Sequence, residues 1–221
     1  MIHIASCKFK YDKEIVVDMN SLKIQEGEHL FLHGKSGTGK STFLNLLCGV
    51  LEPTSGEIEV FKTKLGLLSH AQKDKFRADN YGTIFQQFNL LPYLSVEENI
   101  ALACEFSKLK TSQVKNIKQE IASLLEALEL SVDLKTSAMY LSVGQQQRVA
   151  VARALIGKPK IIIADEPTSA LDSDTKERFM QLLFRQVEAQ NSTLIFVSHD
   201  KSLASNFGRV IDFSDINKVK R

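Results

Sequence analysis

The chain has 221 residues, which is enough for one large α/β domain or a domain with a substantial insertion. Its formal net charge is +2, and its 43% hydrophobic and 24% charged residues are ordinary for a globular protein. The near-neutral charge gives no argument for a nucleic-acid partner, and we expect none. No stretch approaches the 18 apolar residues of a membrane span. We expect no signal peptide, and the three well-separated cysteines indicate a reducing compartment and no zinc site.

Strand patterns open the chain. The segments "MIHIASCKF" and "EIVVDMNSLKI" carry apolar residues in β-like patterns, and "EHLFLH" leads into a glycine-rich loop. They predict antiparallel β structure followed by a buried central strand. Further along, "EPTSGEIEVF" reads as a turn and a short strand, and "YGTIFQ" as another strand.

The glycine-rich loop, in "FLHGKSGTGKSTFLNLL", fits the phosphate-binding pattern G-x-x-x-x-G-K-[ST] from Gly34 to Ser41. Glycines let backbone N–H groups turn toward an anion, and a helix starting near Lys40 points its positive end at the same place. Lys40 offers a charge for the β- and γ-phosphates, and the Ser41 hydroxyl suits Mg²⁺. Many classes of enzyme use such a loop, so the motif alone does not name the function.

The middle of the chain is different, because residues from about 95 to 157 read almost entirely as helix. Strand and helix then alternate: "KIIIAD", "SDTKERFMQLLFRQVEAQ", "STLIFVSHD" and "RVIDFS". Continuous apolar runs such as "KIIIAD" are typical of parallel strands covered on both faces. We therefore predict a single domain over residues 1–221, with a nucleotide-binding core (1–86 and 158–221) and an inserted helical subdomain (87–157).

Two further motifs carry chemistry. "IIIADEPT" is a buried strand that ends in Asp165 and Glu166, and the carboxyl ends of parallel strands are where ligands bind in open α/β sheets. Asp165 is placed to hold Mg²⁺, and Glu166 to take a proton from an attacking water or to orient it. "LSVGQQQRVAVARAL" predicts a helix from Val143 to Leu155 with Ser142 as its N-cap.

Here the chain resembles the ATP-binding cassette (ABC) ATPases, whose signature is L-S-G-G-Q followed by a basic, alanine-rich helix. Five motifs occur in the family's order: the phosphate loop, "FQQFNLLP", "LSVGQQQR", "IIIADEPTSALD" and "VSHD". The resemblance is greatest to the short ATPase subunits of macrolide-export and lipoprotein-release systems. It implies a P-loop core with a parallel sheet, an N-terminal antiparallel β subdomain and an inserted α-helical subdomain.

The resemblance also implies roles for single residues. Gln86 matches the glutamine that contacts Mg²⁺ and the attacking water, with Gln87 as an adjacent rival. His199 matches the histidine that contacts the γ-phosphate, and Asp172 the carboxylate that couples two ATP sites across a dimer. Tyr11 matches the aromatic residue that stacks on adenine, with Phe9 as the competing choice. The residues expected to bind ATP in the loop are Gly34, Lys35, Ser36, Gly37, Thr38, Gly39, Lys40, Ser41 and Thr42, and those expected to hold Mg²⁺ are Ser41, Gln86 and Asp165.

In the family the signature contacts the γ-phosphate bound to a second copy. The resemblance thus implies that Ser142, Gly144 and Gln145 act in trans, in a head-to-tail dimer that encloses two ATP molecules. Val143 departs from the family pattern, because glycine is usual there and a β-branched residue disfavours positive φ.

The partner expected from the resemblance is an integral membrane permease, which would place the chain on the cytoplasmic face of the cell membrane. The stretch "FNLLPY" after Gln86 is too apolar for an ordinary loop, and it either caps the core or receives a helix of the permease. A kinase or GTPase does not fit, because there is no N-K-x-D motif and neither class has the signature. The alternative left open is a non-transport ABC ATPase of a membrane complex, acting in cell division or envelope-stress signalling.

Overall fold

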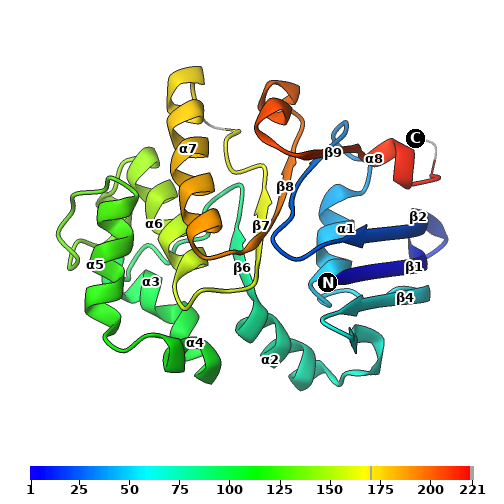
Figure 1. Cartoon of the computed structure of the whole chain (residues 1–221), viewed down its shortest axis with the longest axis horizontal. Coiled ribbons are helices and arrows are strands. Elements are labelled where there is room, and N and C mark those ends of the chain that lie inside the picture. Colours follow the sequence, from blue (N-terminus) through cyan, green and yellow to red (C-terminus); the bar gives the residue numbers. More distant parts are fainter. Residues whose placement is uncertain (170, 220–221) are drawn as a thin grey trace. The chain divides into compact units, whose positions relative to one another are not determined.

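The computed structural model describes residues 1–169 and 171–219, which divide into two compact units (Figure 1). The first unit consists of residues 1–77 with the segment from Thr193 on, and the second of residues 78–192. The boundary falls within helix α2 (His70–Asn80). The predicted nucleotide-binding core and helical subdomain have boundaries that differ from those of the two units, and that division stays a prediction. No helix among the described residues combines the length and the hydrophobicity that crossing a membrane requires.

The first unit contains the predicted antiparallel β structure. Its sheet has the strand order β2-β1-β4-β5. The strands are β1 (Ile2–Tyr11), β2 (Glu14–Ile24), β4 (Ser55–Val60) and β5 (Thr63–Lys64). Along β1 the apolar side chains of Ile2, Ile4, Cys7 and Phe9 are buried, while most of the polar residues between them face solvent. This alternation is what a sheet with one covered face produces.

Three parallel strands complete the first unit and position its loops. β3 (His29–His33) lies between β8 (Thr193–Ser198) and β9 (Arg209–Asp212), with His33 opposite both Ser198 and Asp212. Because the register is parallel, the segments that follow the three strands leave the sheet at the same edge. The helical elements of this unit are α1 (Lys40–Leu47), most of α2, α8 (Phe213–Ile216) and two short 3₁₀ segments (Leu65–Leu67 and Lys201–Asn206).

The second unit combines two parallel strands with a group of helices. β6 (Tyr81–Ile84) pairs with β7 (Ile161–Asp165), and Ile84 lies opposite Ala164. The helices are α3 (Val96–Glu105), α4 (Lys108–Gln113), α5 (Ile117–Ala127), α6 (Val143–Leu155) and α7 (Ser173–Ala189). α6 packs against α3, α5 and β6, so it lies at the centre of this unit (Figure 1).

The helical prediction for residues 95–157 holds for α3 to α6 but is wrong for the segment between Ala127 and Val143. That segment contains only a 3₁₀ turn, Ala138–Tyr140. α5 ends because Glu129 adopts a left-handed conformation, with φ of 54°, and Leu130 donates back to the carbonyl of Leu125 at 2.8 Å. This is a common way for a helix to stop, although glycine usually supplies the left-handed residue.

Candidate functional site

The loop between β3 and α1 has the backbone geometry of a phosphate-binding loop. Gly37 and Gly39 have φ angles of 78° and 102°, in the left-handed region that glycine enters without strain. Gly39 is also tightly packed, because a methyl group added there would lie 2.9 Å from the carbonyl oxygen of Val16. α1 begins at Lys40, directly after this glycine, so the first N–H groups of the helix point back into the loop.

Side chains within the loop hold its shape. The ammonium group of Lys40 donates to the carbonyl oxygens of Gly34 at 2.7 Å and Lys35 at 2.8 Å. The Thr38 hydroxyl donates to the same Lys35 carbonyl at 2.9 Å. Lys40 is buried, so its charge lies within the loop and adds to the positive end of α1. The predicted ATP-binding residues from Gly34 to Thr42 therefore lie in this loop and in the first turn of α1.

Two more predicted residues belong to the first unit. His199 directly follows β8, and since His33 pairs with Ser198, His199 and Gly34 leave neighbouring strands at one edge. Tyr11 ends β1, with its ring 50% exposed and packed edge-to-face on the buried ring of Phe9, at a centroid distance of 4.8 Å. Exposure favours Tyr11 over Phe9 as the ring that can stack on a ligand.

The second unit brings Gln86 to the edge where the two predicted carboxylates lie. Asp165 is the last residue of β7, and Glu166 follows it. Because Ile84 pairs with Ala164, Gln86 leaves β6 at the same edge. Gln86 and Gln87 are both exposed, so exposure does not decide between them.

Glu166 has an unusual backbone conformation, with φ of 50°. A non-glycine residue in this region costs on the order of 1–3 kcal/mol and persists only where surrounding contacts hold it. One such contact comes from α6, where the buried Gln147 side chain donates from Nε2 to the carbonyl oxygen of Pro167 at 2.8 Å. Sequence reasoning missed Gln147, because the run of three glutamines does not indicate which one faces inward.

The signature helix begins as predicted, at Val143 with Ser142 as its N-cap. The Gln145 N–H donates to the Ser142 hydroxyl at 3.4 Å, and the Ser142 N–H donates to the Gln145 side chain at 2.9 Å. This reciprocal pair is a capping box, which fixes both side chains at the start of the helix.

Val143 and Gly144 occupy open, helical positions. Val143 is 53% exposed and lies in the first turn of α6 without a positive φ, so a β-branched residue fits there without strain. A methyl group added to Gly144 would meet no atom within 4 Å, and its φ is not positive. Nothing in the described part of the chain therefore requires glycine at position 144.

Asp172 is the N-cap of α7. It accepts a hydrogen bond from the Thr175 N–H at 3.0 Å and another from the Thr175 hydroxyl at 2.8 Å. These hydrogen bonds from Thr175 lower the pKa of Asp172, because they favour its charged form. The carboxylate is therefore ionised at neutral pH and fixed at the start of the helix.

The apolar stretch after Gln86 is partly buried and partly exposed. Phe88 is buried, Leu90 and Leu91 are partly buried, and Tyr93 is 73% exposed. The backbone here is held by the fully buried Asn99 of α3, which accepts from the Leu91 N–H at 2.8 Å and donates to the Leu91 carbonyl at 3.0 Å. Phe88 thus belongs to the core, whereas the ring of Tyr93 stands on a fixed backbone at the surface.

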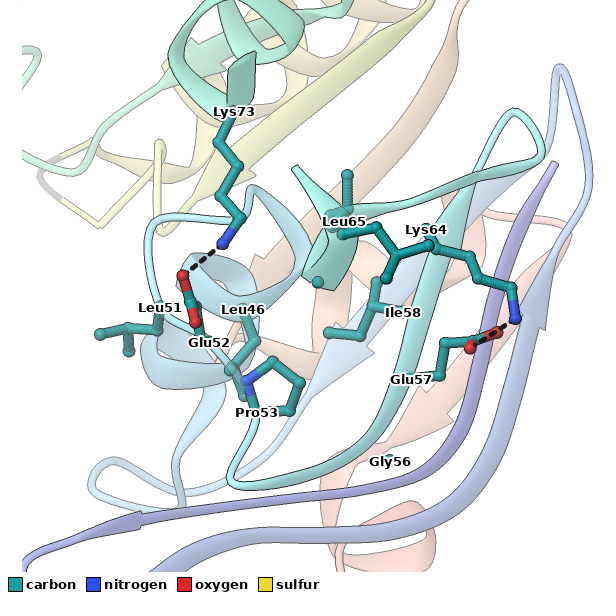
Figure 2. A pocket seen from close by; sticks show the side chains of 13 residues that line it. Leu46, Leu51, Glu52, Pro53, Gly56, Glu57, Ile58, Lys64, Leu65 and Lys73 are labelled. Carbon is teal, nitrogen blue, oxygen red and sulfur yellow. Dashed lines mark hydrogen bonds and ion pairs between the residues drawn. The ribbon is translucent and has the colours of Figure 1, made fainter. Parts of the chain in front are cut away.

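A cavity of about 220 Å³ in the first unit is lined by none of the predicted site residues. Figure 2 shows two ion pairs at this cavity, which join Lys73 to Glu52 and Lys64 to Glu57. The apolar part of its wall includes Leu46, Ile58 and Leu65. Because the two pairs balance their charges, the cavity offers no excess positive charge for an anionic nucleotide.

Comparison with known proteins identifies the family. The family model "ABC transporter" matches residues 17–169. The chain is 39% identical over 216 residues to the uncharacterized ABC transporter ATP-binding protein MJ0796 of Methanocaldococcus jannaschii, covering 96% of this chain and 92% of that protein. It is 38% identical over 194 residues to the lipoprotein-releasing system ATP-binding protein LolD of Syntrophotalea carbinolica, covering 88% and 84%.

Other similarities agree. The chain is 39% identical over 196 residues to the macrolide export ATP-binding/permease protein MacB of Aggregatibacter actinomycetemcomitans, covering 88% of this chain but 30% of that protein. A dimeric, post-hydrolysis structure of the MJ0796 cassette bound to ADP and Pi matches with a TM-score of 0.84 and 35% identity, covering 100% of this chain and 97% of that one. The fold, the loop geometry and these matches agree: the chain belongs to the ABC transporter family, as an ATP-binding cassette with ATPase function.

Proposed function

We propose that the chain is the Mg²⁺-dependent ATPase subunit of an ABC transporter, dimerising around two ATP molecules to drive a membrane permease of the macrolide-export or lipoprotein-release kind. The observation that carries the proposal is the loop from Gly34 to Ser41, with left-handed Gly37 and Gly39 at the start of α1. Backbone N–H groups, the helix dipole and the Lys40 ammonium all favour an anion there. The similarity to LolD and MacB supports the kind of transporter.

In this proposal the loop residues hold the phosphates and Tyr11 stacks on the adenine. The half exposure of Tyr11 supports this role, because its ring packs on that of Phe9 and still leaves surface accessible. Ser41, Gln86 and Asp165 are proposed to hold Mg²⁺, because hydroxyl, amide and carboxylate oxygens are the donors that it prefers. When bound, Mg²⁺ neutralises charge on the β- and γ-phosphates.

Hydrolysis needs a base for the attacking water, and we assign that role to Glu166. A carboxylate within hydrogen-bond reach of the water accepts its proton as the bond to phosphorus forms. The left-handed backbone of Glu166, held by Gln147 through the Pro167 carbonyl, supports a fixed position for this side chain. Gln86 orients the water, and His199 contacts the γ-phosphate.

Ser142, Gly144 and Gln145 are proposed to face the γ-phosphate bound to a second copy, and Asp172 to couple the two sites. The N-terminus of α6 is suited to an anion, and Gly144 leaves open space in front of it. The MJ0796 cassette, which this chain resembles, is dimeric in two structures. ATP would then join the two copies, and hydrolysis would release them.

The permease is proposed to dock on the surface that carries Tyr93, so the chain would lie at the cytoplasmic face of the membrane without crossing it. An exposed aromatic ring on a rigid backbone is typical of contact surfaces in protein complexes. The signal from ATP would reach this surface through the short segment between Gln86 and Tyr93.

The test combines turnover with assembly. Glu166→Gln keeps the shape of the side chain but removes the base, so ATP hydrolysis should fall at least 100-fold while ATP binding persists. Size-exclusion chromatography with ATP should then show a dimer. Adding Ser142→Arg to this variant should return it to monomer, because the large cation enters the space meant for the partner's phosphate.

Glu188→Gln, an exposed carboxylate of α7, is the matched control and should leave hydrolysis unchanged. Near-normal turnover by Glu166→Gln would overturn the role of Glu166. Dimers that persist with Ser142→Arg would overturn the role of the signature.

A further inference from the structure

Asn217, which follows α8, reaches back across the first unit to two early segments of the chain. It is 4% exposed. Its side-chain oxygen accepts from the Asp18 N–H at 2.8 Å. Its side-chain nitrogen donates to the carbonyl oxygens of Val16 at 3.0 Å and of Thr38 at 3.2 Å. One buried amide thus joins the C-terminal segment, β2 and the phosphate-binding loop.

The orientation of this amide is fixed by its partners. Two carbonyl oxygens face one end of the group and an N–H faces the other, so only one of the two possible amide orientations satisfies all three. Both donors and the acceptor of Asn217 are used. Val16, which shares the donor nitrogen, is the residue whose carbonyl oxygen would lie 2.9 Å from a methyl group at Gly39.

The bond to Thr38 bears on the chemistry of the loop. The peptide group between Thr38 and Gly39 is planar, so its C=O and N–H point in opposite directions. Because the Thr38 carbonyl points toward Asn217, the Gly39 N–H points away from Asn217. Gly39 has a φ of 102°, a conformation in which glycine, with no Cβ, does not itself fix the direction of the peptide. A contact from outside the loop, such as that of Asn217, can therefore determine the orientation of the peptide between Thr38 and Gly39.

Phe213 adds support at the same place. Its Cβ would lie 3.3 Å from a methyl group at Gly34, and its ring packs against the ring of Phe43 in α1 at a centroid distance of 5.7 Å. The beginning and the end of the loop are therefore both backed by the segment that starts with α8. Asn217 supplies the polar contact and Phe213 the apolar one.

We propose that Asn217 is a positioning residue for nucleotide binding, which aims the Gly39 N–H at the phosphates by anchoring the Thr38 carbonyl. The inference rests on the proposed role of the loop and adds a residue outside it. Asn217 does not touch ATP. It sets the affinity of the loop for phosphate through the backbone.

Two variants of the full chain test this. Asn217→Asp keeps the acceptor for Asp18 but replaces the donor with an oxygen that repels both carbonyls. Asn217→Leu removes every hydrogen bond at similar volume and adds no charge. Both should raise the KM for ATP and the Kd for ATP, measured by calorimetry, about tenfold, with kcat changed less than threefold.

Comparing the effects on KM and on kcat distinguishes a positioning role of Asn217 from a general effect on protein stability. A purely structural role would reduce the folded fraction, which lowers the apparent kcat and leaves KM unchanged. The matched control is Lys218→Ala, which removes a 2.6 Å bond from the same segment to Asn20 and touches no part of the loop. It should leave both KM and kcat at the wild-type values.

Three outcomes would overturn the proposal: unchanged KM in both variants, raised KM in Asn217→Asp alone, or loss of folding in both. The second would mean that the added charge, and not the anchor, weakens binding. Lys40→Ala in the same assay keeps the two proposals apart. If wild-type protein binds ATP and Lys40→Ala does not, the function of the loop stands whatever the Asn217 variants show.

Discussion

The Gln147 side chain of the signature helix donates a 2.8 Å hydrogen bond to the carbonyl oxygen of Pro167, in the turn that directly follows Glu166. Gln147 is 2% exposed, so water does not replace this bond easily. The signature helix and the turn that carries the proposed catalytic base are therefore joined within a single unit. A shift of α6 on dimer formation would therefore also move the turn that carries Glu166.

The first prediction is that Gln147→Leu lowers kcat for ATP hydrolysis about tenfold or more while the Kd for ATP changes less than threefold. The turn loses its anchor, so the left-handed Glu166 is held less firmly, but the phosphate-binding loop is untouched. The free energy of unfolding should fall by about 1–3 kcal/mol, because the Pro167 carbonyl loses its buried donor. Steady-state kinetics and urea unfolding measure the two effects.

Gln181→Leu is the matched control, since Gln181 is an exposed glutamine of α7. It should change neither quantity. A Gln147→Leu protein with normal kcat would show that the bond to Pro167 is not needed to hold the base.

The second prediction concerns the exposed ring of Tyr93. Tyr93→Asp should leave the ATPase rate of the isolated chain within twofold of wild type, because the side chain is 73% exposed and only surface is altered. In cells it should lower the share of the chain that sediments with the membrane fraction at least fivefold, since a charge enters an apolar contact. Fractionation followed by immunoblotting measures that share.

Phe106→Asp is the control, because Phe106 is an exposed aromatic residue of the same unit with 74% exposure, at the end of α3. It should leave membrane association unchanged. Equal loss in both variants would place the contact elsewhere, or show that any exposed aromatic residue has the same effect.

The third prediction uses the buried Lys110. Burial lowers its pKa to about 8 from 10.5, and its ammonium donates to the Tyr81 carbonyl at 2.7 Å. Below pH 8 the group is charged in both states, and above pH 10.5 it is neutral in both. Between these values the unfolded chain binds more protons than the folded chain, so this group makes folding more favourable as the pH rises.

Lys110→Met should abolish that contribution. Relative to the variant, wild-type protein should gain about 3 kcal/mol in the free energy of unfolding between pH 8 and pH 10.5. Chemical denaturation at several pH values measures it, and Lys108→Met, an exposed lysine of the same helix, should follow wild type. Parallel curves for wild type and Lys110→Met would contradict a lowered pKa in the folded state.

Elements governed by neighbouring residues were predictable. The loop between β3 and α1, the strands β7 and β8 and the start of α6 at Ser142 all follow from local spacing and capping chemistry. Even the missed helix α2 carried a local signal. The Gln72 N–H donates to the Ser69 hydroxyl, and the Ser69 N–H donates to the Gln72 side chain at 2.8 Å, a capping box legible as "SHAQ".

Segments without such signals were not predictable. The helical pattern continued through residues 128–142. Glu129 ends α5 with a left-handed backbone, but glutamate is not a residue type that indicates a helix end. Likewise "FNLLPY" is mostly apolar, yet packing buries Phe88 and exposes Tyr93. Composition does not distinguish the two rings, because burial is decided by what the rest of the chain places over each.

The sequence by itself determined the family and predicted which side chains carry the chemistry, because each motif consists of residues close together in the chain. Only the tertiary structure decided how those groups are held. Gln147 bonds to a carbonyl 20 residues away, and Asn217 to carbonyls 179 and 201 residues away. No local pattern encodes these pairs, since each forms only when packing closes the loop between its partners and removes water from around it.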